Sequence, residues 1–347
     1  MQNTGQYTQH EILTQPEAWA VTLASVRAQV DTLRDFYRAG QYQSVIFTGC
    51  GSTFYLSLAA AALFQELTGM PARGLPASEI WLYPRSAFTQ RRTLLIAVGR
   101  SGETTETLRA CQAFRADGGD VLTLSCYPGR PMTTLGDINL VFPAGQENSI
   151  AQTRAFSSLY LATTALAAIC AGRDDMFEEL TRLPKVGRRL LAEYSDLARQ
   201  LGSDANLDRF YFLGSGPRYG LACELSLKMK EMSLSHSEPF HFLEFRHGPK
   251  SMLTPSTLLV GLVSETNRSH EMSVLEEMRA RGARLLAIGE GESDVTFASG
   301  VSEAARSVLY LPVGQLLAFE RAVQRGLDPD HPHNLDAVVK LDEQRAA

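Results

Sequence analysis

Short apolar runs alternate with longer stretches of helical periodicity along most of the chain. Runs such as Leu94–Val98 end at glycine or polar turns, which is typical of parallel strands covered on both faces. Between such runs, Phe54–Glu66, Thr104–Ala116 and Leu221–Leu234 carry apolar residues at the spacing of amphipathic helices. This alternation predicts an α/β fold made of doubly wound parallel sheets with helices on both faces.

The second half of the chain repeats the first. Val45 opens an apolar run that ends in a glycine turn, and Phe210 opens a run of the same form 165 residues later. Three further pairs of runs recur in the same order, 164 to 169 residues apart: Thr93 with Thr257, Val121 with Leu285, and Val141 with Tyr310. We read all of these runs as strands. Four pairs at nearly one spacing predict two tandem copies of one α/β unit.

The repeat also suggests where the domains begin and end. We expect a helical arm, with its helix from about Pro16 to Ala39, and a join in the charged, helical stretch Arg173–Ala205. The expected parts are an arm at 1–40, a first domain at 41–185, a second at 186–327 and a C-terminal tail at 328–347.

Length and composition agree with two ordinary globular domains. The 347 residues include 44% hydrophobic and 20% charged residues, which argues against disorder and supplies material for more than one core. There are 33 Lys and Arg against 38 Asp and Glu, so the formal net charge is −5. This balance gives no basic footprint for nucleic acid, and no nucleic-acid partner is expected.

Cysteine usage and the N-terminus favour a cytoplasmic protein. The five cysteines are odd in number and form no C-x-x-C pair, as expected of reduced thiols. The first residues are polar and lack the layout of a signal peptide. The longest apolar stretch, Leu159–Gly172, is short and contains threonines, which favours a buried helix over a membrane span. No membrane partner is expected.

Two glycine turns follow predicted strands in the first half. Gly49–Phe54 has two glycines of a dinucleotide fingerprint, but Phe54 stands at the third glycine position, which weakens that interpretation. Gly99–Thr105 is the better candidate for an anion, because glycines let the backbone approach a phosphate at a helix N-terminus. The competing interpretation is a plain helix cap with Ser101 as the capping residue. Two such turns on adjacent strands would surround one phosphate group.

The second half holds a dense cluster of ionisable residues. Lys228 and Glu231 are three apart and share one face of a helix whose neighbours are apolar. Buried ionisable groups of this kind are what acid–base chemistry uses, whereas the simpler interpretation is a surface ion pair. His236, His241 and His247 match no usual metal-ligand spacing, so no metal ion is expected. No cofactor is expected either.

In this order, the motifs resemble those of a known family. The chain is similar, from about residue 40 to 340, to a pair of sugar-isomerase (SIS) domains, as in the isomerase half of glucosamine-6-phosphate synthase and in stand-alone amino-sugar-phosphate deaminases. The segments that carry the resemblance are Cys50–Thr53, Arg100–Thr104, Gln152–Phe156, Leu227–Glu231, His236–Glu238, Glu244–Pro249 and Arg325–Leu335. The resemblance implies two flavodoxin-like SIS domains.

The resemblance assigns the phosphate of a sugar to the first half. By position, it implies that Ser52, Thr53, Arg100, Ser101 and Thr104 hold this group. A separate grip on the phosphate lets binding energy align the reacting carbons.

The resemblance assigns the proton transfers to the second half. Glu231 matches the base that moves a proton between C1 and C2, and Lys228 matches a lysine near O1 and O2. His247 matches the residue that opens the sugar ring, and in the family it reaches the site from a neighbouring subunit. The expected partners are therefore a small phosphosugar and a second copy of the chain, in a homodimer.

The sequence departs from the family pattern at two positions. Gly99 stands where the family often has serine, so one hydroxyl for the phosphate is lost. Ala337 stands where the synthase has the lysine that forms an imine with the ketose, and the nearest lysine is Lys340. We therefore hypothesise that no enzyme–substrate imine forms. The glutaminase domain of the synthase has no counterpart in these residues, so glutamine hydrolysis is not expected.

These observations favour an enzyme that converts glucosamine 6-phosphate to fructose 6-phosphate and ammonia. The alternatives are an isomerase or deglycase acting on another phosphosugar, and a non-catalytic regulator that binds a phosphosugar. Glu231 and His247 favour an enzyme, because a sensor needs neither a base nor a ring-opening acid.

Overall fold

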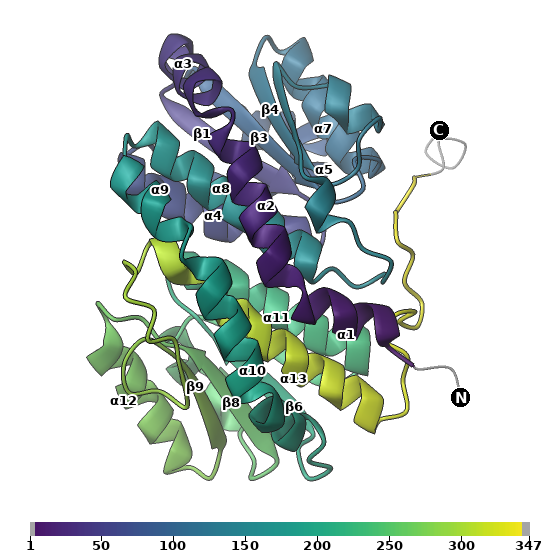
Figure 1. Cartoon of the computed structure of the whole chain (residues 1–347), viewed down its shortest axis with the longest axis vertical. Coiled ribbons are helices and arrows are strands. Elements are labelled where there is room, and N and C mark those ends of the chain that lie inside the picture. The colour runs from purple at the N-terminus through teal and green to yellow at the C-terminus, as the bar shows by residue number, and fades with distance from the viewer. Residues whose placement is uncertain (1–3, 342–347) are drawn as a thin grey trace. The chain divides into compact units, whose positions relative to one another are not determined.

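The chain folds into two compact units in the computed structural model, which describes residues 4–341 (Figure 1). Unit 1 combines the N-terminal residues up to Glu17 with Glu147–Thr153 and Glu178–Leu335. Unit 2 combines Ala18–Gln146, Arg154–Phe177 and the residues from Asp336 onward. The chain thus passes from one unit to the other several times, and the expected N-terminal arm and C-terminal tail are each divided between the two units.

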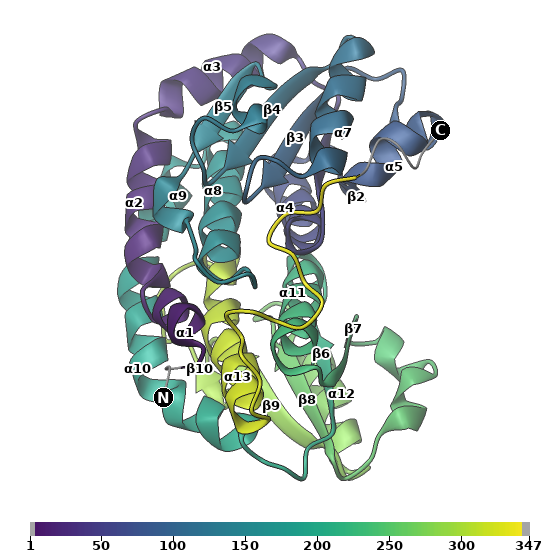
Figure 2. The same cartoon turned by 90° about the vertical axis from the view of Figure 1, so that its right-hand side faces the viewer.

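Unit 2 is built on a five-stranded sheet whose strands are all parallel, in the order β2-β1-β3-β4-β5 (Figure 2). Its strands are β1 (Ser44–Gly49), β2 (Ala72–Pro76), β3 (Thr93–Gly99), β4 (Asp120–Ser125) and β5 (Ile138–Val141). Its helices are α2 (Gln15–Arg27), α3 (Val30–Gly40), α4 (Ser52–Thr68), α5 (Ala77–Leu82), α6 (Pro84–Ala87), α7 (Thr105–Ala116), α8 (Arg154–Cys170) and α9 (Asp174–Leu180), of which α2 and α9 extend across unit boundaries.

Side chains alternate between the two faces of this sheet. Ile46 and Leu95 pack with Ala110 and Phe114 of α7, whereas the neighbouring Phe47 meets Phe64 of α4 edge to face, at 5.7 Å between ring centroids. Both faces of the strands are therefore covered by helices, which explains why their sequences are apolar throughout.

Unit 1 repeats this architecture with a second parallel sheet, in the order β10-β9-β8-β6-β7. Its strands are β6 (Arg209–Leu213), β7 (His236–Phe240), β8 (Thr257–Leu262), β9 (Arg284–Gly289) and β10 (Val295–Thr296). Its helices are α1 (Gln6–Leu13), α10 (Leu183–Gly202), α11 (Pro217–Ser233), α12 (Arg268–Arg279) and α13 (Leu311–Gln324), with α10 and α13 side by side in Figure 1. Short 3-10 helices are η1 (Pro131–Thr134) and η2 (Pro143–Gly145) in unit 2, and η3 (Glu244–Arg246), η4 (Pro249–Met252) and η5 (Ala305–Tyr310) in unit 1.

The two sheets have the same strand order when each is numbered from its own first strand. β6 lies between β7 and β8 just as β1 lies between β2 and β3. The predicted fold class, two tandem doubly wound parallel-sheet units, is therefore confirmed. Three of the four predicted pairs of runs are pairs of strands: β1 with β6, β3 with β8, and β4 with β9.

The fourth predicted pair was wrong. Val141 does end strand β5, but its counterpart Tyr310 ends the 3-10 helix η5, and Leu311 begins the helix α13. Pro312 stands in the first turn of α13, where proline favours a helix start. The helix is buried along most of its length, so its first residues form the same unbroken apolar run as a buried strand.

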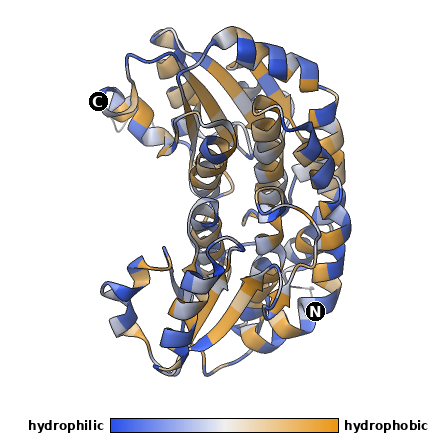
Figure 3. Cartoon of the chain, turned by 90° about the vertical axis from the view of Figure 1, so that its left-hand side faces the viewer, coloured by the Kyte–Doolittle hydropathy of each residue, from blue (hydrophilic) through white to orange (hydrophobic). Residues whose placement is uncertain are grey.

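The predicted buried helix around Leu159–Gly172 is α8, in which every residue from Ala155 to Ile169 is buried. Among residues 4–341, no helix is both long and apolar enough to cross a membrane. The predicted helix from Pro16 to Ala39 is two helices, α2 and α3. Hydropathy colouring shows the strands of both sheets as mainly apolar (Figure 3).

Candidate active site

The loop between β3 and α7 in unit 2 presents donors for an anion. Gly102 has a φ of +70°, a backbone conformation that glycine adopts without strain. Within the described part of the chain, the backbone N–H groups of Ser101 and Gly102 donate to no protein acceptor. The Ser101 hydroxyl accepts from the Glu103 N–H at 3.2 Å, which leaves its own O–H group as a donor.

Thr104 is the N-cap residue of α7. Its side chain makes no capping hydrogen bond, so the helix does not use this hydroxyl to satisfy its own first turn. Ser101 does not cap the helix either, because its hydroxyl bonds within the loop to Glu103. The plain-cap interpretation of this motif is therefore wrong. The loop keeps hydroxyl and amide donors beside the positive end of a helix of 12 residues.

The neighbouring loop follows β1. Because β1 and β3 pair in parallel, from Ser44 with Thr93 to Thr48 with Ala97, both loops leave the same edge of the sheet. Ser52 is the first residue of α4 and is buried. The Thr53 hydroxyl accepts from the Cys50 N–H and donates to the Cys50 carbonyl, both at 2.9 Å. Thr53 therefore closes its own turn in this structure, and its hydroxyl proton is already used.

Arg100 is only 7% exposed, and its Nη2 atom donates to the carbonyl of Ala337 at 3.2 Å. The Leu341 N–H donates to the Thr105 hydroxyl at 3.2 Å. The segment around Ala337 therefore lies against the loop that carries the predicted phosphate residues, within unit 2. Ala337 contributes a backbone carbonyl to this contact.

Cys50 follows β1 and Gly99 ends β3, and the surroundings of each account for its small size. A Cβ atom built on Gly99 would lie 3.1 Å from the sulfur of Met132, so the methionine side chain fills the space beside this glycine. Cys50 is half-buried, and burial raises the pKa of its thiol. This thiol therefore stays protonated and acts as a packing residue in the turn.

Two of the residues predicted to carry acid–base chemistry, Lys228 and Glu231, lie on α11 in unit 1. The Lys228 side chain is 1% exposed, and its ammonium group contacts a carboxylate oxygen of Glu231, whose side chain is 18% exposed. The Nζ atom of Lys228 also lies 3.4 Å from Oε1 of Glu224, which is completely buried. The structure thus brings Lys228 and Glu231 together, as the sequence predicted, and adds Glu224.

This arrangement can hold a reactive carboxylate in place. A buried ammonium needs opposite charge nearby, and one carboxylate a turn before Lys228 and another a turn after it provide this charge. Of the two glutamates, only Glu231 has a partly exposed side chain, so its carboxylate is the one that can contact a substrate. The sequence signal for Glu224 was its position four residues before Lys228, which our prediction did not use.

His247 follows the 3-10 helix η3. Its side chain is exposed, and none of the hydrogen bonds or ion pairs in the described part of unit 1 involves its ring. Glu277 of α12 forms ion pairs with Arg246 at 2.7 Å and with Lys250 at 3.2 Å. These two ion pairs anchor the loop that carries His247. His247 is therefore exposed on a loop that ion pairs to α12 hold in place.

The other two histidines of this region are engaged separately. His241 stacks on Tyr219 with ring centroids 3.8 Å apart, and burial lowers the pKa of His241. His236 lies 3.7 Å from Glu238. Among residues 4–341, no group of three or more His, Cys, Asp or Glu side chains is arranged to hold a metal ion.

The described part of the chain is a tandem pair of flavodoxin-like units, one with a loop of unused backbone donors and the other with a buried lysine–carboxylate group. A sequence profile of the SIS domain matches residues 41–169 and 205–311. The chain therefore belongs to the SIS domain family.

Similar proteins are known by sequence and by structure. The chain is 30% identical over 314 residues to a glutamine–fructose-6-phosphate aminotransferase (isomerizing) of Methanothermobacter thermautotrophicus, in a match covering 87% of this chain and 52% of the relative. A second such aminotransferase, from Pyrobaculum aerophilum, is 30% identical, with 96% of this chain and 57% of the relative covered. The chain thus spans about half the length of the curated relatives it matches.

Two solved structures have the same fold. A glucosamine-6-phosphate deaminase from Thermotoga maritima is 28% identical with a TM-score of 0.76, covering 92% of this chain and 99% of the other. A tagatose-6-phosphate ketose/aldose isomerase from Escherichia coli has a TM-score of 0.84 over 94% of this chain and 95% of the other. At 22% identity, the second likeness concerns the fold alone.

We predict that Lys228→Met destabilises the protein by about 3–5 kcal/mol at neutral pH. The substitution keeps an unbranched side chain, one atom shorter, but removes the ammonium group that lies 3.4 Å from the buried Glu224 carboxylate. Urea unfolding at neutral pH would measure the loss.

Lys230→Met is the matched control, because Lys230 lies on the same helix and is exposed. It should change the free energy of unfolding by less than about 0.5 kcal/mol. Equal losses for the two variants would show that Lys228 does not compensate a buried charge.

Proposed function

We propose that the protein is a phosphosugar isomerase that releases ammonia from glucosamine 6-phosphate and gives fructose 6-phosphate. The observation that carries the proposal is the Glu231 carboxylate, held at the protein surface by a fully buried lysine. The names of the relatives support the substrate class, since they include aminotransferases acting on fructose 6-phosphate and a glucosamine-6-phosphate deaminase.

The loop after β3 is proposed to hold the phosphate group. The N–H groups of Ser101 and Gly102 and the hydroxyls of Ser101 and Thr104 supply neutral donors, and α7 adds its positive end. Arg100 supplies a positive charge and is held by the Ala337 carbonyl. An anionic substrate can thus be bound by a protein whose formal net charge is −5.

Glu231 is proposed to move one proton during the reaction. In the open-chain aldose it takes the proton from C2 and delivers a proton to C1, while O1 gains one proton and the amine loses one. C1 thereby becomes a hydroxymethyl group and the C2 amine becomes an imine. Water then adds to this imine and ammonia leaves, which gives the ketose. The Lys228 ammonium beside Glu231 can donate hydrogen bonds to O1 as negative charge develops there, which lowers the barrier to enolisation.

His247 is proposed to open the sugar ring at the site of a neighbouring copy of the chain. Its exposed position on an anchored loop supports this role. A homodimer with exchanged histidines is accordingly part of the proposal.

We predict that Glu231→Gln lowers the rate of ammonia release by about 100- to 10,000-fold, the range expected for loss of a general base. The amide keeps the shape of the side chain but cannot take the proton from C2. The measurement is ammonia production from glucosamine 6-phosphate, with fructose 6-phosphate followed in parallel. Glu276→Gln, an exposed glutamate that pairs with Arg279, should keep wild-type activity.

Ammonia release at the wild-type rate by Glu231→Gln would contradict the proposed role of this residue. If wild type and variant both bind several phosphosugars and neither turns any over, the protein is a phosphosugar-binding regulator instead.

We further predict that borohydride traps no covalent adduct between the protein and fructose 6-phosphate. Ala337 has no amine, and its backbone carbonyl faces Arg100. Intact-mass measurement after reduction should therefore give the mass of the unmodified chain. A gain equal to one reduced hexose phosphate would contradict this, and its loss in Lys340→Met would identify the lysine responsible.

A further inference from the structure

The loop between β8 and α12 in unit 1 is the counterpart of the anion loop in unit 2. β8 occupies the place of β3 in the strand order, and Thr257 corresponds to Thr93. At this offset of 164 residues, Glu265 stands at the position of Ser101 and Thr266 at that of Gly102. The two loops thus offer comparable sets of backbone N–H groups at the carboxyl edge of a central strand.

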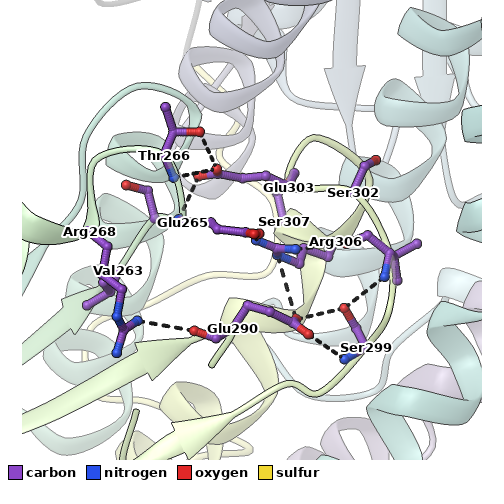
Figure 4. Close-up of polar contacts among 12 residues, drawn as sticks. Val263, Glu265, Thr266, Arg268, Glu290, Ser299, Ser302, Glu303, Arg306 and Ser307 are labelled. Carbon is purple, nitrogen blue, oxygen red and sulfur yellow. Dashed lines mark hydrogen bonds and ion pairs between the residues drawn. The ribbon is translucent and has the colours of Figure 1, made fainter. Parts of the chain in front are cut away.

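In unit 1 these donors are occupied by a carboxylate of the chain itself, that of Glu303 (Figure 4). The Thr266 N–H and hydroxyl donate to Oε2 of Glu303 at 3.0 and 2.8 Å. The Glu265 N–H donates to Oε1 of Glu303 at 3.3 Å. Glu303 therefore receives from this loop the kind of hydrogen bonds that a phosphate oxygen would receive.

A buried arginine completes the set of donors. Arg218 is 6% exposed, and its Nη1 atom donates to Oε1 of Glu303 at 2.7 Å. It follows the glycine turn after β6, at the position that Thr53 holds in unit 2. Its Nε atom is buried and has no hydrogen-bond acceptor among residues 4–341, so the guanidinium has donor capacity to spare.

The charge on Glu303 is stabilised by these contacts. Burial raises the pKa of its carboxyl group, but the hydrogen bonds from Thr266 and Glu265 and the charge of Arg218 outweigh burial and lower it below the ordinary value. Glu271 also lies 3.7 Å from Arg218, so one arginine faces two carboxylates. At neutral pH the Glu303 carboxylate is therefore an anion that the loop between β8 and α12 binds.

The segment that carries Glu303 is held in place on its other side. Arg306, 2% exposed, donates to the Val301 carbonyl at 2.8 Å and lies 3.8 Å from Glu290. Glu290 accepts from the Ser299 N–H and hydroxyl, both at 2.8 Å. Figure 4 shows Glu290, Ser299 and Arg306 together, and their contacts fix the backbone on both sides of Glu303.

We propose that Glu303 is a built-in anion that fills the phosphate-type site of unit 1 and keeps phosphate esters out of it. The chain then has a single site for the phosphate of its substrate, in unit 2. Removing the carboxylate leaves two loop amides, the Thr266 hydroxyl and Arg218 free to bind inorganic phosphate or a phosphate monoester. If Glu303 only ties its segment to the sheet, its removal creates no such site.

The test is the number of inorganic phosphate ions bound per chain, measured by equilibrium dialysis with radiolabelled phosphate at constant ionic strength. Glu303→Ala should bind one more phosphate than the wild-type protein. Glu265→Ala is the matched control, because it removes a carboxylate that pairs with Arg306 but leaves Glu303 in the loop. The control should bind the wild-type number.

The test compares the number of phosphate ions bound by Glu303→Ala with the number bound by the wild-type protein. The difference between them does not depend on whether unit 2 itself binds phosphate. No phosphate on wild type and one on Glu303→Ala would support the built-in anion while contradicting the phosphate site of unit 2. Equal numbers on a folded Glu303→Ala variant and on the wild type would overturn the built-in anion.

If Glu303→Ala does not fold without ligand, the proposal predicts that phosphate restores its folding, whereas chloride at equal ionic strength does not. A second variant, Glu303→Gln, keeps an oxygen that can accept from Thr266 but has no charge. Phosphate should raise its Tm more than it raises the Tm of the wild-type protein, because the bound ion stabilises the folded state. If phosphate has no such effect on either variant, the proposal is wrong.

Discussion

The structure depends on one constraint of parallel sheets: strands that run in the same direction place all their carboxyl ends at one edge. In each unit the chain reverses its direction of winding beside the first strand, between β1 and β3 and again between β6 and β8. Two helix N-termini therefore diverge from neighbouring loops at that point, and their N–H groups face the same region. The N–H groups at these helix N-termini attract an anion, and in each unit they need a hydrogen-bond acceptor.

The two units meet this requirement differently. Unit 2 keeps the amides of Ser101 and Gly102 free of protein acceptors, as far as the structure describes the chain, whereas unit 1 supplies the carboxylate of Glu303. The helix after the first strand has also diverged. In unit 1 it is α11, which carries the buried Lys228 between Glu224 and Glu231. Two copies of one architecture can thus supply a grip for a phosphate and a base for proton transfer.

Much of the fold could be predicted because strands covered on both faces must be apolar along their whole length. The same rule misled at Tyr310–Gly314, where a buried helix start forms an equally unbroken apolar run. Lys228 and Glu231 could be paired from their spacing on one helix. The hydrogen bond of the Thr53 hydroxyl within its own turn could not be predicted, because residue type does not reveal which acceptor a hydroxyl contacts. Glu303 was missed because it binds a loop 37 residues earlier in the chain.

The central claim is that unit 2 holds the phosphate and Glu231 of unit 1 moves the proton. Incorporation of deuterium from D₂O into the carbon-bound positions at C1 and C2 of the sugar phosphate, followed by NMR, tests both parts. The wild-type protein should incorporate deuterium, because the proton on the Glu231 carboxyl group can exchange with D₂O before it is delivered to C1. Glu231→Gln should not incorporate deuterium at any substrate concentration. Ser101→Ala should be slow at low substrate concentration and recover at high concentration, because only binding is weakened. Wild-type incorporation by Glu231→Gln, or no recovery by Ser101→Ala, would contradict the account.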